Sequence, residues 1–102
     1  RLHRADGSEI AVLEANRVVE GHPYHPYLKS HQRPEYGTLE AADGQLLHYR
    51  VIKPKDFDPA KRYPVFLRVY GGPHVQYVQR RWDERWGLFD QVMAQRGYVV
   101  YS

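Results

Sequence analysis

The sequence predicts an α/β fold in which an antiparallel hairpin precedes a strand–helix–strand unit. Three observations lead to this fold class. An Asp-Gly pair at 43–44 separates two segments that alternate in polarity, and a near-continuous apolar run covers residues 63–70. Helical spacing of apolar residues over 84–96 then leads into a second apolar segment at 98–101. Because a strand, a helix and another strand form a right-handed parallel crossover by strong precedent, we expect a mixed sheet.

The hairpin is expected to pair residues 37–42 with residues 45–53. Gly44 accepts the positive φ that a tight hairpin turn requires. Along the second strand, alternate residues from Leu47 to Val51 form the less polar set, so one face of the strand should be less polar than the other.

The apolar run at 63–70 is broken only by Arg68, and such a run is typical of a strand covered on both faces. Tyr70 is its last residue before a Gly-Gly-Pro turn at 71–73. In an open α/β sheet, ligands bind just past the carboxyl ends of the strands. A phenol held there can donate a hydrogen bond to a developing oxyanion. The same residues also fit a strand that ends in an ordinary turn with an interfacial tyrosine.

The helix is expected to begin after Asp83, whose carboxylate can cap it, and to run from residue 84 to residue 96. Gly97 fits the left-handed conformation that ends a helix. A broad apolar stripe on this helix is expected in the core. Its members are Trp82, Trp86, Leu88, Phe89, Val92 and Met93.

The amino-terminal part is expected to be less regular. Residues 1–13 predict two short strands around an Asp-Gly turn at 6–7. Residues 17–20 fit either a short strand or an extended crossing. The prolines of segment 21–34 favour extended backbone, so we interpret it as a connection packed by its tyrosines rather than as a free linker.

Three histidines in this connection, His22, His25 and His31, raise the hypothesis of a metal site. The prolines between them break a helical arrangement of ligands, and no thiol or carboxylate lies close in sequence to complete the set. We therefore expect no metal and no other cofactor.

The composition excludes several classes of protein. The chain of 102 residues can bury one modest core, and its aromatic content of 14% argues against disorder. The absence of cysteine excludes disulfides and thiolate metal sites, and no apolar run reaches the length of a membrane helix. The net charge of +3 is dispersed except at Arg80, Arg81 and Arg85. A solvated helix start explains that patch at least as well as nucleic-acid binding does, so we expect no nucleic-acid partner.

Two parts of the chain resemble the opening of the catalytic domain in the prolyl oligopeptidase family of serine peptidases, most of all its bacterial dipeptidyl peptidase IV members. The specific match comprises residues 61–67 (KRYPVFL), residues 69–73 (VYGGP), Gln76 and Trp86. A supporting match comprises residues 42–45 (ADGQ) and 47–54 (LHYRVIKP). The chain departs from some relatives in having Gly71 where they carry Ala and Tyr77 where they carry Lys.

The resemblance implies a partial α/β-hydrolase preceded by the terminal strands of a β-propeller. Residues 1–16 would form the end of the last propeller blade, residues 17–37 the interdomain connection, and residues 38–102 the start of the catalytic domain. It also implies a parent enzyme that acts on peptides as a homodimer, in the periplasm or outside the cell, with no membrane partner.

The implied activity is the release of N-terminal dipeptides with Pro or Ala in second position. Tyr70 matches the tyrosine whose hydroxyl stabilises the oxyanion in that family. The nucleophile of the family lies in a Gly-x-Ser-x-Gly elbow, but Ser8, Ser30 and Ser102 lie in no such motif. We therefore expect the nucleophile, Asp and His to lie outside this chain, and the chain to be a fragment that hydrolyses nothing by itself.

Two alternatives accompany this interpretation. Gln76 is a candidate for orienting backbone near Tyr70, whereas a surface glutamine is the plainer explanation of it. The chain would alternatively be a non-enzymatic, β-rich interaction module that binds a partner through the exposed aromatic residues of segment 22–28, as tyrosine-rich surfaces do.

Overall fold

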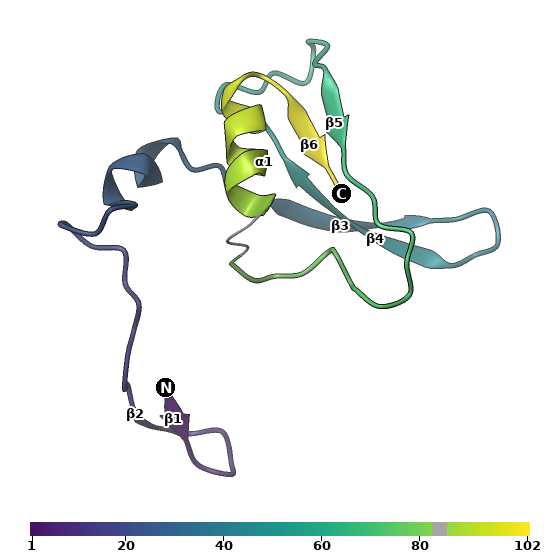
Figure 1. Ribbon diagram of the computed structural model, residues 1–102. Helices are drawn as coiled ribbons and strands as arrows, with labels where there is room; N and C mark the ends of the chain where they lie inside the picture. Colours follow the sequence, from purple (N-terminus) through teal and green to yellow (C-terminus); the bar gives the residue numbers. More distant parts are fainter. Residues whose placement is uncertain (83–85) are drawn as a thin grey trace.

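The computed structural model of the protein describes residues 1–82 and 86–102. Its elements form a small hairpin, a connecting segment with one 3-10 helix, and a four-stranded mixed sheet with one α-helix on one face (Figure 1). In chain order they are β1 (Leu2–His3), β2 (Glu9–Ala11), η1 (His25–Ser30), β3 (Glu35–Glu40), β4 (Leu46–Ile52), β5 (Val65–Leu67), α1 (Trp86–Gln95) and β6 (Val99–Tyr101).

The amino-terminal hairpin pairs β1 with β2 in antiparallel register, as the sequence predicts. Gly7 has a φ of 86°, and the backbone N–H of Arg4 donates to the carbonyl of Ser8 at 2.9 Å. In Figure 1 this hairpin lies away from the four-stranded sheet. Residues 17–20 form no strand. Of the two predicted alternatives, a short strand or an extended crossing, the second therefore remains.

The connecting segment contains a 3-10 helix that the sequence reasoning did not predict. The expectation of extended backbone throughout 21–34 was wrong for η1, residues His25–Ser30. Pro26 lies in the first turn of this helix. Proline is tolerated there because its fixed φ suits a helix and its missing N–H would have no partner in any case.

The main sheet has the strand order β3-β4-β6-β5. β3 and β4 are antiparallel from Glu35 opposite Val51 to Glu40 opposite Leu46, and Gly44 in their turn has a φ of 82°. The predicted hairpin is therefore confirmed, although its first strand begins at Glu35 rather than at residue 37. β4 and β6 are antiparallel, whereas β6 and β5 are parallel, which confirms the expected mixed sheet.

β5 is shorter and more exposed than predicted. It covers Val65–Leu67 instead of 63–70, and the side chains of Val65 and Leu67 are exposed. The expectation of burial on both faces was wrong for these residues because β5 is the edge strand of the sheet and α1 covers only one face (Figure 1). Pairing with β6 nonetheless continues past the strand, since the N–H of Arg68 donates to the carbonyl of Tyr101 at 2.8 Å.

Helix α1 ends as the sequence predicts. Gly97 has a φ of 87°, its N–H donates to the carbonyl of Ala94 at 3.0 Å, and the N–H of Tyr98 donates to the carbonyl of Met93 at 3.1 Å. This pair of bonds is the Schellman motif. The predicted cap Asp83 and the predicted first residue Glu84 lie outside the described residues.

The buried face of α1 differs from the predicted one. Its buried residues are Asp90, Gln91 and Ala94, and only Met93 of the apolar stripe packs against the core. The other members are exposed: Trp82, Trp86, Leu88, Phe89 and Val92. The expectation that this stripe lies in the core was therefore wrong for these residues. The physical reason is charge. Arg50 and Arg68 of the sheet side pair with the carboxylate of Asp90, so the helix face that carries Asp90 turns toward the sheet.

The core beneath α1 is small. Ile52 of β4, Ala94 of α1 and Val100 of β6 are almost fully buried, with Phe66 and Met93 packed against them. Among the described residues, no helix combines the length and the apolar character that crossing a lipid bilayer requires.

Candidate functional site

Tyr70 lies just beyond the carboxyl end of β5, at the sheet edge where the parallel neighbour β6 also ends. Its side chain is 45% exposed, so it is not enclosed by apolar packing. The ring stacks on Tyr77, with 5.6 Å between centroids and 20° between planes. The hydroxyl lies over Gly72, where an added Cβ would come within 2.6 Å of it. A strand end thus presents an accessible phenol, as oxyanion stabilisation would require.

Gln76 belongs to the loop after Tyr70 but is not brought to the Tyr70 hydroxyl. Its backbone carbonyl accepts a hydrogen bond from the side-chain amide of Gln79. Gln76 also borders an open cavity of about 460 Å³ between this loop and the β3–β4 hairpin, where His48 and Arg80 are among the other lining residues. The proposed role of Gln76 in orienting backbone near Tyr70 remains a prediction.

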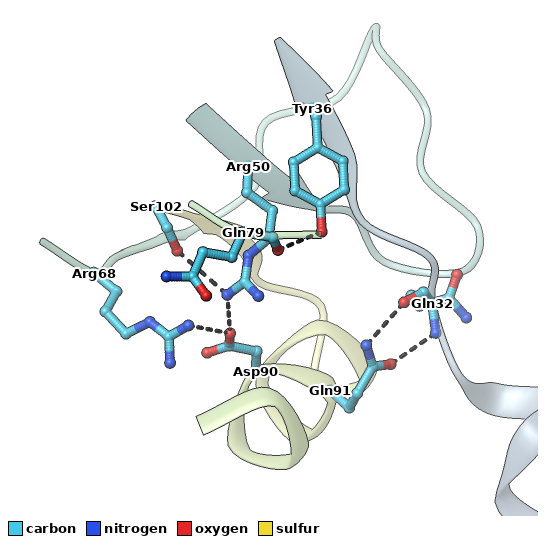
Figure 2. A network of polar contacts seen from close by, with 8 residues as sticks. All are labelled: Gln32, Tyr36, Arg50, Arg68, Gln79, Asp90, Gln91 and Ser102. Carbon is cyan, nitrogen blue, oxygen red and sulfur yellow. Dashed lines mark hydrogen bonds and ion pairs between the residues drawn. The ribbon is translucent and has the colours of Figure 1, made fainter. Parts of the chain in front are cut away.

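A buried charge cluster joins the sheet to α1 (Figure 2). The fully buried carboxylate of Asp90 accepts from Arg50 at 2.6 Å and is 2.8 Å from Arg68. Arg50 also lies 3.5 Å from the hydroxyl of Ser102. Buried charges are expensive unless they are paired, so the three charged residues specify how helix and sheet fit together.

Sequence reasoning missed this cluster, although a signal was present. Arg68 interrupts an otherwise apolar strand, and a lone charge in such a run has to reach a partner or water. Asp90 in the helix was the complementary signal. Their pairing across the crossover could not be predicted, because it depends on which helix face meets the sheet.

Two further polar contacts attach the connection and the loop to this framework. The side-chain amide of Gln91 pairs with the backbone of Gln32, accepting from its N–H at 2.7 Å and donating to its carbonyl at 2.8 Å (Figure 2). The hydroxyl of Tyr36 donates to the carbonyl of Gln79 at 3.0 Å, and the guanidinium of Arg80 lies 4.9 Å from the centroid of the Tyr36 ring. Of the basic patch, Arg85 lies outside the described residues.

The histidines of the connection do not form a three-ligand metal site in the described part of the chain. Within residues 1–82 and 86–102, no three His, Cys, Asp or Glu side chains come together in a way that could hold a metal ion. His31 instead belongs to an aromatic cluster. Its Nδ1 lies 2.7 Å from the hydroxyl of Tyr24, and its ring stacks on Trp82 at 5.8 Å. Tyr24 meets Trp82 edge-on at 5.3 Å, so this tyrosine packs as predicted for the connection, whereas Tyr27 is exposed and the prediction was wrong for it.

This aromatic cluster predicts a loss of stability in acid. Burial lowers the pKa of His31, and the nearby charge of Arg33 lowers it further, while burial raises the pKa of Tyr24. The folded state therefore prefers neutral His31. Above the ordinary pKa of 6.5 neither state is protonated and stability is fully present. Below it the unfolded chain binds the proton first, so stability falls as the pH drops from 6.5 through the folded-state pKa.

The measurement is an NMR titration of the His31 ring together with thermal unfolding at pH 7.5 and pH 5.5. We expect a protonation midpoint below 6.5 and a smaller drop in melting temperature on acidification for His31→Gln, which has no proton to gain. Equal drops for the original chain and the variant would contradict the prediction.

Comparison with known proteins places this geometry in a family. No protein-family model matches the chain. Human "Prolyl endopeptidase FAP" is 39% identical over 94 residues, which are 90% of this chain and 11% of that protein. Mouse "Dipeptidyl peptidase 8" is 37% identical over 73 residues, which are 72% of this chain and 8% of that protein.

Solved structures agree with these relatives. Dipeptidyl peptidase 4 of Porphyromonas gingivalis superposes with a TM-score of 0.74 at 30% identity, covering 97% of this chain and 13% of its own. A putative dipeptidyl aminopeptidase IV of Bacteroides ovatus superposes with a TM-score of 0.65 at 47% identity, covering 74% of this chain and 11% of its own.

The strand-end tyrosine on a mixed sheet and these relatives define the class: the chain belongs to the prolyl oligopeptidase family. Within that family it is a member of the dipeptidyl peptidase IV-like branch. The chain spans only 8% of one of the relatives described above and 11% of the other.

Proposed function

We propose that this chain is part of a serine-type dipeptidyl peptidase that releases N-terminal dipeptides with Pro or Ala in second position. The observation that carries the proposal is the tyrosine Tyr70, which is 45% exposed just past the end of β5 in the Tyr-Gly-Gly-Pro context. The names of the relatives support the reaction class, since they are dipeptidyl peptidases and prolyl endopeptidases.

In the proposed reaction, the Tyr70 hydroxyl donates one hydrogen bond to the oxyanion. When a serine attacks the peptide carbonyl, the carbonyl oxygen gains negative charge, and a fixed donor about 2.7–3.1 Å from that oxygen lowers the barrier. Tyr70 follows a strand whose pairing with β6 continues to Arg68, and its ring stacks on Tyr77, so little reorganisation is needed at the moment of reaction. The nucleophile, its base and the orienting carboxylate would come from outside this chain, which has no Gly-x-Ser-x-Gly elbow.

The proposal extends to the organisation of the enzyme. Residues 1–16 would end a β-propeller, residues 17–37 would connect the domains, and residues 38–102 would open the α/β-hydrolase domain. The isolated hairpin of β1 and β2 agrees with the first part, because two strands form only part of a blade. A homodimeric enzyme in the periplasm or outside the cell completes the proposal.

The test uses glycyl-prolyl 4-nitroanilide as the substrate. We expect the complete protein to release the dipeptide and 4-nitroaniline, and the 102-residue chain alone to give no turnover above a buffer blank, because a donor without nucleophile and base performs no acyl transfer. Turnover by the chain alone would disprove the assignment of the nucleophile to another part of the protein. Inactivity of the complete protein on dipeptide amides would disprove the proposed reaction.

A further inference from the structure

The loop that follows Tyr70 is held by side chains rather than by backbone. Among the described residues, no backbone-to-backbone hydrogen bond is found for residues 69–78. The orientation of the Tyr70 ring therefore depends on what its faces touch. One contact is the stack on Tyr77, and the other is the backbone at Gly72 beneath the hydroxyl.

Tyr77 is itself anchored to the rigid part of the fold. The guanidinium of Arg68 lies 5.1 Å from the centroid of the Tyr77 ring, a cation–π distance. Two contacts hold Arg68 in place. Its backbone continues the β5–β6 pairing, and its side chain, only 11% exposed, is paired with the buried carboxylate of Asp90. A continuous series of contacts thus runs from the centre of the α1–sheet interface to the phenol.

We propose that Tyr77, backed by Arg68, is a positioning residue that sets the orientation of the Tyr70 hydroxyl. This inference rests on the proposed function. The two tyrosine planes are nearly parallel, so sliding or tilting of Tyr70 breaks the stack. The absence of a side chain at Gly72 leaves room for the Tyr70 hydroxyl. Together the two contacts restrict the phenol to one orientation.

The first experiment removes the flat ring of Tyr77 in the complete protein and follows glycyl-prolyl 4-nitroanilide hydrolysis. Tyr77→Leu keeps apolar volume but cannot stack in the same way. We expect kcat to fall about ten- to a hundredfold with little change in KM, because a misplaced group can cost up to about a hundredfold and the oxyanion exists only in the transition state. Tyr77→Phe keeps the stack and should restore most of the turnover. Tyr27→Ala, at an exposed tyrosine outside the loop, is the matched control and should leave kcat unchanged.

A double-mutant cycle separates positioning from general stability. If Tyr77 acts through the hydroxyl, adding Tyr77→Leu to Tyr70→Phe should lower kcat no further than Tyr70→Phe alone. Multiplicative losses in the double variant would overturn the positioning role while leaving the proposed function intact. Unchanged kcat in Tyr77→Leu would also overturn the positioning role and leave the proposed function intact. Full turnover by Tyr70→Phe would overturn both the inference and the role given to Tyr70.

Gly72 and Gly71 provide a second test that leaves Tyr77 untouched. Neither glycine has a positive φ, so alanine fits both backbones. At Gly72 the new methyl group would meet the Tyr70 hydroxyl, whereas at Gly71 nothing lies within 4 Å. We expect Gly72→Ala to lower kcat and Gly71→Ala to leave it unchanged, with equal melting temperatures. Equal kcat for the two alanine variants would show that the contact at Gly72 does not restrict the Tyr70 phenol.

Discussion

Replacing Tyr70 with Phe in the complete protein is expected to lower kcat for glycyl-prolyl 4-nitroanilide about a hundred- to a thousandfold. The ring and its stack on Tyr77 remain, so only the hydroxyl donor is lost. The loss corresponds to about 3–4 kcal/mol of transition-state stabilisation. Because the hydroxyl acts on charge that develops during the reaction, kcat and kcat/KM should fall together and KM should change little.

The matched control is Tyr63→Phe, which removes a tyrosine hydroxyl just before β5 instead of just after it. The Tyr63 hydroxyl accepts from the backbone N–H of Asp58 at 2.8 Å and therefore belongs to a turn. Its removal should leave kcat unchanged. Steady-state kinetics of both variants, with circular dichroism to verify folding, show whether the Tyr70 hydroxyl contributes to catalysis. Equal turnover by Tyr70→Phe and Tyr63→Phe would make Tyr70 a structural residue.

Local features of this fold could be predicted from sequence because short-range chemistry determines them. Gly44 marks the hairpin turn and Gly97 ends the helix, and both adopt the positive φ that few other residues tolerate. The parallel pairing of β5 with β6 followed from the order strand, helix, strand. The Gly-Gly-Pro turn is also a local signal, and it correctly placed Tyr70 near a strand end, although the strand ends at Leu67 and Tyr70 is not its last residue.

The rest depended on information that local patterns do not carry. Apolar spacing on α1 correctly predicts a helix but does not say which face turns toward the sheet. The face that does so carries Asp90, because Arg50 and Arg68 are the residues it meets. Likewise, an apolar run predicts β5 but not that α1 covers only one face of the sheet (Figure 1), which leaves Val65 and Leu67 exposed on the other.

The buried charge cluster should be the most costly polar contact to break. The ion pairs Arg50–Asp90 and Lys53–Glu35 have the same N–O distance of 2.6 Å. The first pair has side-chain exposures of 6% and 0%, and the second has 36% and 60%. Asp90→Ala leaves two buried guanidiniums without their shared carboxylate, so we expect the free energy of unfolding to fall by about 3–5 kcal/mol. Glu35→Ala should cost less than about 1 kcal/mol, because water solvates its partner.

Urea unfolding of the two variants, followed by far-ultraviolet circular dichroism, measures this difference. A cost for Asp90→Ala no larger than that for Glu35→Ala would mean that water reaches the arginines. The core beneath α1 adds little compensating stability, since Ile52, Ala94 and Val100 are the only buried apolar residues there within 1–82 and 86–102. Loss of Asp90 also removes one of the contacts that hold the Arg68 side chain against Tyr77, so in the complete protein Asp90→Ala should lower kcat as well as stability. A stability loss with undiminished kcat would separate the cluster from the orientation of Tyr70.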